Sequence, residues 1–128
     1  RLTGIIDGGT IEVEYGGQIH RVRMQGILVP NKDNADPRVA DAGRRAEELT
    51  SLLLQGTPLL LEWDVTDADE DGALLRYVWA GGRHVGYELV RQGLASVRIN
   101  ETDTRYQDTL YAAQLAAQQE CLGLWACP

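Results

Sequence analysis

Acidic side chains alternate along one short stretch, Asp67-Ala68-Asp69-Glu70-Asp71-Gly72, in the D-x-D-x-D-G pattern that opens calcium-binding loops. In such loops, alternate carboxylates and a sharp glycine turn wrap one cation. The twelfth position should be a bidentate glutamate but is Val78, and the flanking segments are typical of strands rather than helices. We therefore expect a solvated acidic turn, and keep calcium held by Asp67, Asp69 and Asp71 as the weaker alternative.

Arginines are the second group of residues with a possible chemical use. Arg21 and Arg23 share one face of a predicted strand, because strand side chains alternate with a period of two. Together with Arg76 and Arg83 they could gather on one face and bind a phosphate or an acidic peptide, but a solvated face that binds nothing is the interpretation that we favour.

Histidines offer no metal site. His20 and His84 are isolated in the sequence and have neither the ligand spacing nor the cysteine partners of a zinc site. We expect both to be surface or hydrogen-bonded side chains.

Acidic residues dominate the charge balance, with 19 Asp and Glu against 12 Lys and Arg and a net charge of −7. Electrostatic attraction supplies nearly all non-specific affinity for nucleic acid, so this balance counts against a nucleic-acid partner and favours a protein. No apolar run is long enough to cross a bilayer.

Two cysteines, Cys121 and Cys127, lie six residues apart near the C-terminus. We expect a disulfide between them, with two unpaired thiols as the alternative. Such bonds persist in oxidising compartments, which predicts a periplasmic or secreted protein. The chain starts at Arg1 without an initiator methionine, so we expect that a signal peptide, an anchor or another domain could precede it.

Hydrophobic periodicity predicts one domain over residues 1–128. Apolar and polar residues alternate over residues 2–6, 10–15 and 18–25, which predicts three strands, and two further strands are predicted over residues 58–63 and 74–79, around the acidic turn. Helices are predicted over 41–55, capped by Asp41, over 87–92, and from about residue 103 to Cys121, with an exposed loop over 29–43. This order predicts an α+β, mainly β fold: a five-stranded OB-fold barrel with three helices.

Several segments match a known family. The runs Ile6-Asp7-Gly8-Gly9-Thr10-Ile11 and Arg21-Val22-Arg23-Met24-Gln25-Gly26-Ile27 resemble two signature segments of staphylococcal-nuclease-like domains. Leu89-Val90-Arg91-Gln92-Gly93-Leu94-Ala95 and Gly123-Leu124-Trp125 resemble two further segments of that family. These matches spread over nearly the whole chain in the right order, and the resemblance implies the same OB-type fold.

The resemblance also implies a chemistry, calcium-dependent hydrolysis of DNA and RNA by water activated near a glutamate, with two arginines clamping the phosphate. At the positions of the two metal-binding aspartates this chain has Gly9 and Leu28, and Asn31 replaces the glutamate base. The second clamp arginine is Ala73, so that Arg23 alone is retained. Leucine cannot coordinate calcium, and a neutral amide cannot accept a proton from water. Other nucleotide-pocket positions of the family are Glu70, Asp71, Ile99 and Glu101 here.

These replacements predict a catalytically inactive domain that acts as a binding or assembly module, most simply for a protein partner, with no cofactor. The expected ligand-binding residues are Arg21, Arg23, Asn31 and Arg76. The expected contact regions are the cleft around Arg23, Leu28 and Asn31, and the irregular loop over 31–41. Two alternatives stay open: a calcium-dependent nuclease with a non-standard site, and a module that binds nucleic acid without hydrolysing it.

Overall fold

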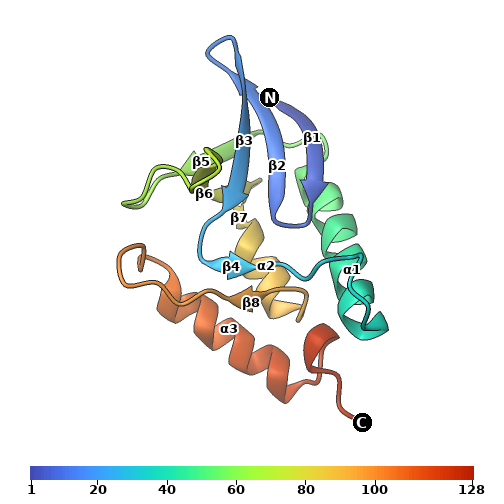
Figure 1. Cartoon of the computed structure of the whole chain (residues 1–128). Helices are drawn as coiled ribbons and strands as arrows, with labels where there is room; N and C mark the ends of the chain where they lie inside the picture. The colour runs from blue at the N-terminus through green and yellow to red at the C-terminus, as the bar shows by residue number, and fades with distance from the viewer.

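The computed structural model describes residues 1–128 and is built around one main β-sheet (Figure 1). Its order is β1 (Leu2–Asp7), β2 (Thr10–Tyr15), β3 (Gln18–Met24), β6 (Leu74–Ala80) and β5 (Leu59–Glu62). The two-residue strand β7 (Arg83–His84) also pairs with β6, whereas β4 (Ile27–Leu28) and β8 (Ser96–Val97) pair with each other in a separate two-stranded sheet. All five predicted strands are present, in the expected α+β, OB-type arrangement.

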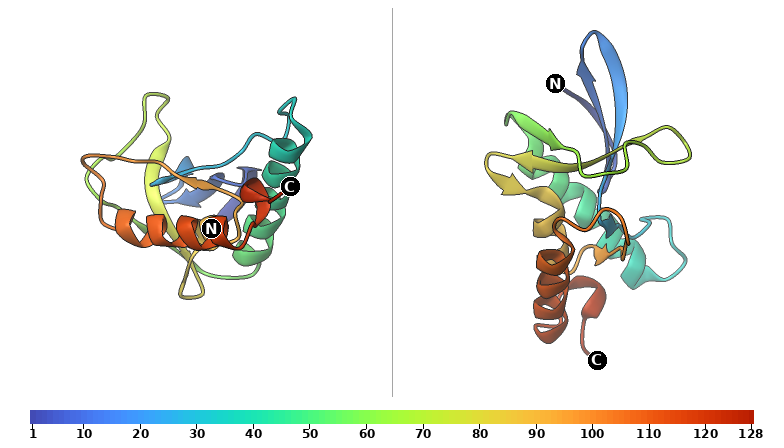
Figure 2. Two further views of the ribbon diagram at one scale, coloured as in Figure 1. Left: turned by 90° about the horizontal axis from the view of Figure 1, so that it is seen from below. Right: turned by 90° about the vertical axis from the view of Figure 1, so that its left-hand side faces the viewer.

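Three helices and a closing turn complete the fold. They are α1 (Pro37–Leu54), α2 (Val85–Arg91), α3 (Gln107–Gln119) and the 3-10 turn η1 (Gly123–Trp125). Figure 2 shows the β2–β3 hairpin projecting at one end of the molecule and α3 with the C-terminus at the other. None of the helices combines the length and the apolarity that crossing a bilayer requires.

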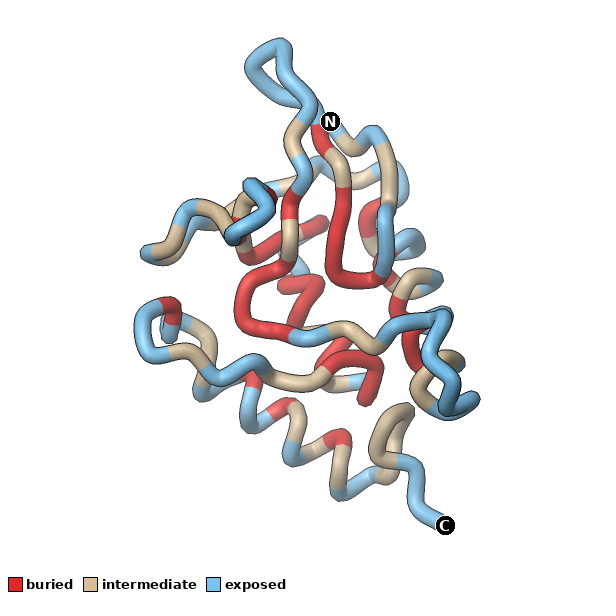
Figure 3. The backbone as a smooth tube through the Cα atoms, in the orientation of Figure 1, coloured by how far each residue is buried: buried red, intermediate tan, exposed pale blue.

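The hydrophobic core lies between the sheet and the helices, and the longest buried runs of the chain are residues 8–11, at the turn into β2, and residues 24–27, at the end of β3 and the turn after it (Figure 3). Ile11 and Val22, opposite each other in the β2–β3 ladder, are fully buried. Strand alternation therefore leaves the intervening polar residues, such as Arg21, outside.

Helix α1 begins four residues before the predicted position. Asp36, not Asp41, is the N-cap, and its carboxylate accepts a hydrogen bond from the Arg38 N–H at 2.9 Å. Pro37 occupies the first turn, where its missing N–H has no helical partner to lose. The prediction that the loop extends to residue 43 was wrong because Pro37 opens the helix rather than interrupting it.

The other two helices also differ at their starts. Helix α2 begins two residues before the predicted position, with His84 as its N-cap, and α3 begins at Gln107 rather than near Asp103. The buried face of α3 contains Leu110, Ala113 and Ala117 as predicted.

His84 lies inside the protein. Its side chain is hydrogen-bonded, as one of the two expectations had it: Nδ1 accepts from the Tyr87 N–H at 3.0 Å, while Nε2 is buried without a partner. The rings of Tyr77, Trp79 and Tyr106 surround the imidazole, with centroids 5.0–5.6 Å away. Burial lowers the pKa of His84 below its ordinary value of 6.5, against a weaker opposing effect of the Glu62 carboxylate.

A lowered pKa makes the stability of the fold depend on pH. Because folding favours the neutral imidazole, this contribution to the free energy of unfolding is complete above 6.5 and is lost as the pH falls below that value. Urea denaturation between about pH 8 and about pH 5 should show this loss, and His84→Asn, a cap that does not titrate, should flatten it. The control variant His20→Asn should show the same dependence of unfolding free energy on pH as the wild type. If His84→Asn also shows the wild-type dependence, His84 is not its source.

Candidate functional site

A small cleft lies where the β1–β2 turn, the end of β3, β4 and the segment after β8 meet. It encloses about 220 Å³, and its lining includes Asp7, Gly9, Arg23, Leu28 and Arg98. The structure thus brings together the predicted site positions 9, 23 and 28. Asn31 lines a neighbouring cavity of about 320 Å³ that also includes Asp7, and Ala73 is buried behind the acidic turn.

The space beside Gly9 is filled. Asp7 Oδ1 accepts a hydrogen bond from the Gly9 N–H at 2.8 Å, which closes the turn between β1 and β2. A Cβ on Gly9 would lie 2.6 Å from Cγ2 of Val29 and 3.3 Å from its Cβ. Because a β-branched side chain has few rotamers, Val29 cannot simply swing away. A side chain at position 9 therefore requires Val29 to move.

The loop that carries Asn31 is pinned against α1. A Cβ on Gly43 would lie 2.6 Å from the carbonyl oxygen of Pro30 and 2.7 Å from the backbone nitrogen of Lys32. The absence of a side chain at Gly43 thus lets the helix touch the loop backbone, which holds Asn31 beside the cleft.

Arg23 is held by the acidic turn. Its Nη1 donates to Asp69 Oδ2 at 2.8 Å, while Asp69 Oδ1 accepts from the backbone N–H groups of Asp71 and Ala73, both at 2.9 Å. The neighbouring Asp67 Oδ1 accepts from Arg76 Nη2 at 2.8 Å. Two of the three candidate calcium ligands of the weaker alternative are thus paired with arginines, and nowhere do three His, Cys, Asp or Glu side chains converge to hold a metal ion.

A comparison with known families identifies the fold. The sequence matches the profile described as staphylococcal nuclease homologue over residues 21–127. The chain belongs to the staphylococcal nuclease family.

Relatives in this family cover most of the chain. A thermonuclease of Staphylococcus intermedius is 31% identical over 121 residues, which are 94% of this chain and 72% of the relative. A thermonuclease of Staphylococcus hyicus is 30% identical over 126 residues, 98% of this chain and 75% of the relative. The SPbeta prophage-derived endonuclease YokF of Bacillus subtilis is 33% identical over 127 residues, which make up 98% of this chain but 43% of that protein.

The four predicted arginines of this nuclease-family domain do not gather on one face. The parallel β3–β6 register pairs Arg23 with Leu75 and Met24 with Arg76, so Arg23 and Arg76 project from opposite faces of the sheet. Arg83 pairs with Ala80 at the far end of β6. The alternation of side chains along one strand correctly predicted that Arg21 and Arg23 lie on the same face of β3. It gives no information on how separate strands are aligned with one another.

Arg98 is the functional candidate that sequence reasoning missed. It lines both the small cleft and a second, larger cavity, is exposed, and forms no ion pair. Its position just after the two-residue strand β8 provides no periodic signal, so only the fold reveals it.

The second cavity encloses about 430 Å³ between the acidic turn and the loop that leads from β8 to α3. Asp103 joins these walls: Oδ1 accepts from the backbone N–H groups of Val65 at 2.9 Å and Thr66 at 2.7 Å, and Oδ2 accepts from the Thr66 hydroxyl at 2.6 Å. Burial by itself raises the pKa of Asp103, but these hydrogen bonds outweigh burial and lower it.

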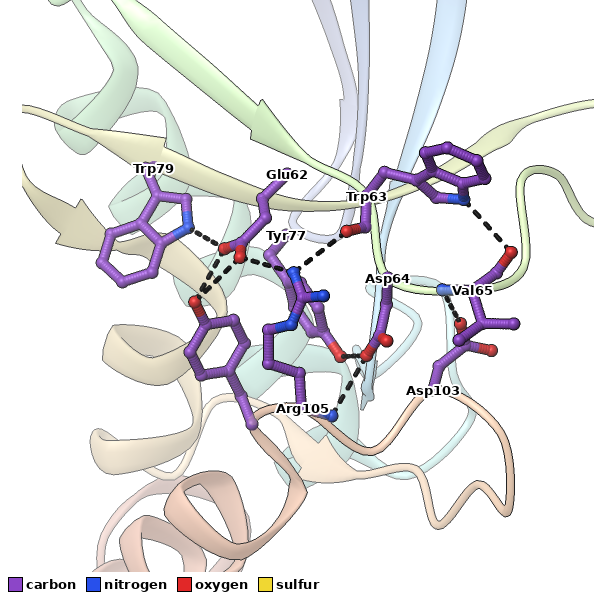
Figure 4. A network of polar contacts seen from close by, with 9 residues as sticks. Glu62, Trp63, Asp64, Val65, Tyr77, Trp79, Asp103 and Arg105 are labelled. Atoms are coloured by element: carbon purple, nitrogen blue, oxygen red, sulfur yellow. Dashed lines mark hydrogen bonds and ion pairs between the residues drawn. The ribbon is translucent and has the colours of Figure 1, made fainter.

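A second set of contacts strengthens the same junction (Figure 4). Glu62 on β5 accepts hydrogen bonds from Tyr106 at 2.8 Å, Trp79 at 2.9 Å and Arg105 at 2.7 Å. Asp64 accepts from the Tyr77 hydroxyl at 2.7 Å. Burial, and then the hydrogen bond to Asp64, raise the pKa of Tyr77, so it remains a donor. The walls of the second cavity are therefore held in place from both sides.

The C-terminal tail is tied back to α1. The structure joins Cys121 and Cys127 by a disulfide, with their Cα atoms 5.2 Å apart, and Arg38 Nη2 donates to the Ala126 carbonyl at 2.9 Å. This places the predicted cysteine pair away from both cavities.

Putting a carboxylate back at position 9 should destabilise the protein. Gly9→Asp is expected to lower the free energy of unfolding by about 1–3 kcal/mol, because Val29 must leave its place. Val29→Ala alone should also destabilise the protein, yet in the Gly9→Asp background it should recover part of the loss. Urea denaturation of all four proteins measures this coupling, which we expect to be at least about 1 kcal/mol. Strictly additive effects would contradict the contact.

Proposed function

We propose that this member of the staphylococcal nuclease family does not cleave phosphodiester bonds and acts as a binding or assembly module for a protein partner. The observation that supports this best is that Val29 fills the space beside Gly9, where the family resemblance places a metal-binding carboxylate. Leu28 stands at the second such position, and Asn31 at the position of the base. Apolar and amide side chains supply neither a charged oxygen ligand for calcium nor a general base.

The state of Arg23 supports the same conclusion. Its guanidinium pairs with Asp69 at 2.8 Å, so a phosphate would have to compete with a carboxylate that the turn already holds. Removing one preorganised charge from such a site typically costs about 3 kcal/mol, or two orders of magnitude in rate. This chain lacks several of them together, and the expected turnover is negligible.

Charge and exposure favour a protein as the partner. The net charge of −7 repels a phosphate backbone. Large apolar side chains also stand exposed beside the cleft: Leu28 on β4 is 53% exposed, and Ile99 just after β8, the strand paired with β4, is 69% exposed. Exposed apolar side chains suit the apolar centre of a protein interface.

The names of the relatives favour a second candidate, a nuclease. Proteins named thermonuclease and endonuclease are 30–33% identical to this chain over the aligned residues. That candidate predicts cleavage of DNA or RNA that requires calcium and Arg23. A third possibility, binding of nucleic acid without cleavage, predicts affinity that falls steeply with added salt.

One assay separates the three candidates. The purified protein is incubated with end-labelled single-stranded DNA and RNA, with calcium or with a chelator, and both cleavage and retention are measured, with a thermonuclease as the positive control. We expect neither cleavage nor retention. Cleavage that is lost with the chelator and with Arg23→Ala, but kept in the control Arg83→Ala, would overturn the proposal. Salt-sensitive retention without cleavage would replace the protein partner by nucleic acid.

A further inference from the structure

Strand β3 has an unpaired edge where the β2–β3 hairpin projects from the rest of the molecule (Figure 2). Strand β2 pairs with β3 over residues 18–23, but on the other side β6 pairs with it only over residues 22–24. None of the backbone hydrogen bonds outside the helices and strands reaches residues 18–21. The outer side of these residues is therefore a free strand edge, which is a template for a further strand.

The hairpin that carries this edge is ordered. Gly16 and Gly17 have φ of +60° and +77° and form a two-residue turn with positive φ at both positions, the kind of turn whose twist matches that of the strands. Near this turn the rings of Tyr15 and His20 stack, with centroids 4.2 Å apart. An added strand would thus meet a preorganised edge, and the hairpin would lose little conformational entropy on binding.

The edge of β1, on the other side of the hairpin, is protected in a way that the β3 edge is not. The pairing of β1 with β2 is interrupted twice, between residues 2 and 4 and between residues 5 and 7. Such irregularities twist an edge strand and disfavour further pairing. Helix α1 also packs against β1. The β2–β3 register has no interruption, so the free edge of β3 stays open to pairing.

Two side chains determine which strand fits this edge. Ile19 and Arg21 are two residues apart and share one face of β3. Ile19 is 55% exposed, and Arg21 is exposed and forms no ion pair. Since side chains directly across a sheet contact each other, a fitting strand has an apolar residue opposite Ile19 and a carboxylate opposite Arg21. Glu12 of β2 already lies on the other side of Arg21, so the guanidinium would stand between two carboxylates.

A second copy of the chain does not meet this requirement. Strand β3 contains no aspartate or glutamate, so two β3 edges paired with each other would leave both copies of Arg21 without a new carboxylate. Nucleic acid lacks the alternating N–H and C=O groups that continue a sheet. An extended segment of another protein supplies both the backbone groups and the side chains.

We propose that the free edge of β3, residues 18–21, binds an extended segment of a protein partner in which a carboxylate lies two residues from an apolar side chain. The segment continues the sheet beyond β3, with its carboxylate paired to Arg21 and its apolar side chain against Ile19. This inference rests on the proposed function, because it names the surface and the kind of segment by which the module holds its partner. It also gives Arg21 a role outside the cleft.

The test is a titration of ¹⁵N-labelled protein with the acetylated peptide amide Thr-Leu-Thr-Glu-Thr-Leu-Thr, with chelator present and nucleic acid absent. A leucine lies two residues from the glutamate on both sides, so this peptide fits in either strand direction. One control peptide has glutamine in place of the glutamate. In the other, proline replaces both threonines beside the glutamate, which removes backbone donors.

We expect saturable shifts of the backbone amides of residues 18–21 with the glutamate peptide, and slower hydrogen exchange at the same amides. The glutamine peptide should bind about two- to fivefold more weakly, the range of an exposed ion pair, and the proline peptide should give no saturable shift. The net charge of the protein is −7, so non-specific attraction would favour the neutral peptide instead.

Variants assign the effects to the two side chains. Arg21→Gln should bind the glutamate and glutamine peptides equally. Ile19→Thr keeps a β-branched residue on the strand but should weaken both peptides. Arg83→Gln, on β7, is the matched control and should bind as the wild type does. All three positions are exposed, so the thermal midpoint should change little.

Several outcomes would overturn the inference. These are no saturable shift with the glutamate peptide, equal binding of the proline peptide, and an unchanged preference for glutamate in Arg21→Gln. Shifts at residues 18–21 that depend on protein concentration without peptide would assign the edge to a second copy and contradict the proposed occupant. None of these measurements involves calcium or nucleic acid. Failure here is therefore distinct from failure of the proposed function, which calcium-dependent cleavage would reveal.

Discussion

Replacing Gly93 with alanine is expected to lower the free energy of unfolding by about 2–5 kcal/mol, the sum of a left-handed backbone and an overpacked contact. Gly93 has a φ of +74°, and an added Cβ would lie 2.2 Å from the carbonyl oxygen of Leu122. The obstacle is backbone, not a side chain that can rotate. At the same place the Leu124 N–H donates to the Gly93 carbonyl at 2.8 Å, so the end of α2 holds the turn η1.

Gly82 provides the matched control for this experiment. Its φ is +80°, but nothing lies within 4 Å of an added Cβ. Gly82→Ala should therefore lower the free energy of unfolding only by the strain of the left-handed backbone, about 1–2 kcal/mol, in the same urea denaturation. If the two variants lose equal amounts of unfolding free energy, the close approach of Leu122 to Gly93 does not contribute to the effect of Gly93→Ala.

Replacing Asp103 with alanine is the second large effect. The residue is 2% exposed and accepts hydrogen bonds from the backbone of Val65 and from the backbone and hydroxyl of Thr66. Its loss leaves these donors unpaired, and we expect a decrease of about 3 kcal/mol in the free energy of unfolding. The walls of the second cavity should separate as well, which faster amide hydrogen exchange at Val65 and Thr66 would report.

Acid should reproduce part of this effect. Because the pKa of Asp103 is lowered from its ordinary value of 3.8, its contribution to stability is complete above that value and is lost as the pH falls below it. Glu101→Ala, an exposed change in the same loop, is the control and should alter stability by less than about 0.5 kcal/mol. If Asp103→Ala costs no more than this control, the carboxylate does not hold the two loops together.

Local periodicity predicted the elements better than their boundaries. The alternation of Ile11 and Val13 with glutamates located β2, and the spacing of Leu110, Ala113 and Ala117 located the buried face of α3. The start of α1 was misplaced because Asp36-Pro37 is compatible both with a loop and with a capped first turn. A cap is recognised with confidence only when its side chain is seen to accept a backbone N–H.

The candidate site was predictable only in part. Matching family segments located positions 9, 23 and 28, and the structure brings these three together at one cleft. The contribution of Arg98 was not predictable, since this residue does not stand out in composition or spacing. The alternative in which Arg21, Arg23, Arg76 and Arg83 gather on one face does not hold, because strand register depends on the partner strands.

By itself the sequence determined the OB-type fold, the family, and the replacement of the metal carboxylates by Gly9 and Leu28. These properties follow from residue identity and from burial patterns that repeat every two or four residues. Only the tertiary structure decided that Val29 occupies the space beside Gly9, and that Asp69, 46 residues away in the chain, pairs with Arg23. Such contacts join segments whose meeting depends on loop conformation and packing of the whole domain, which no local pattern encodes.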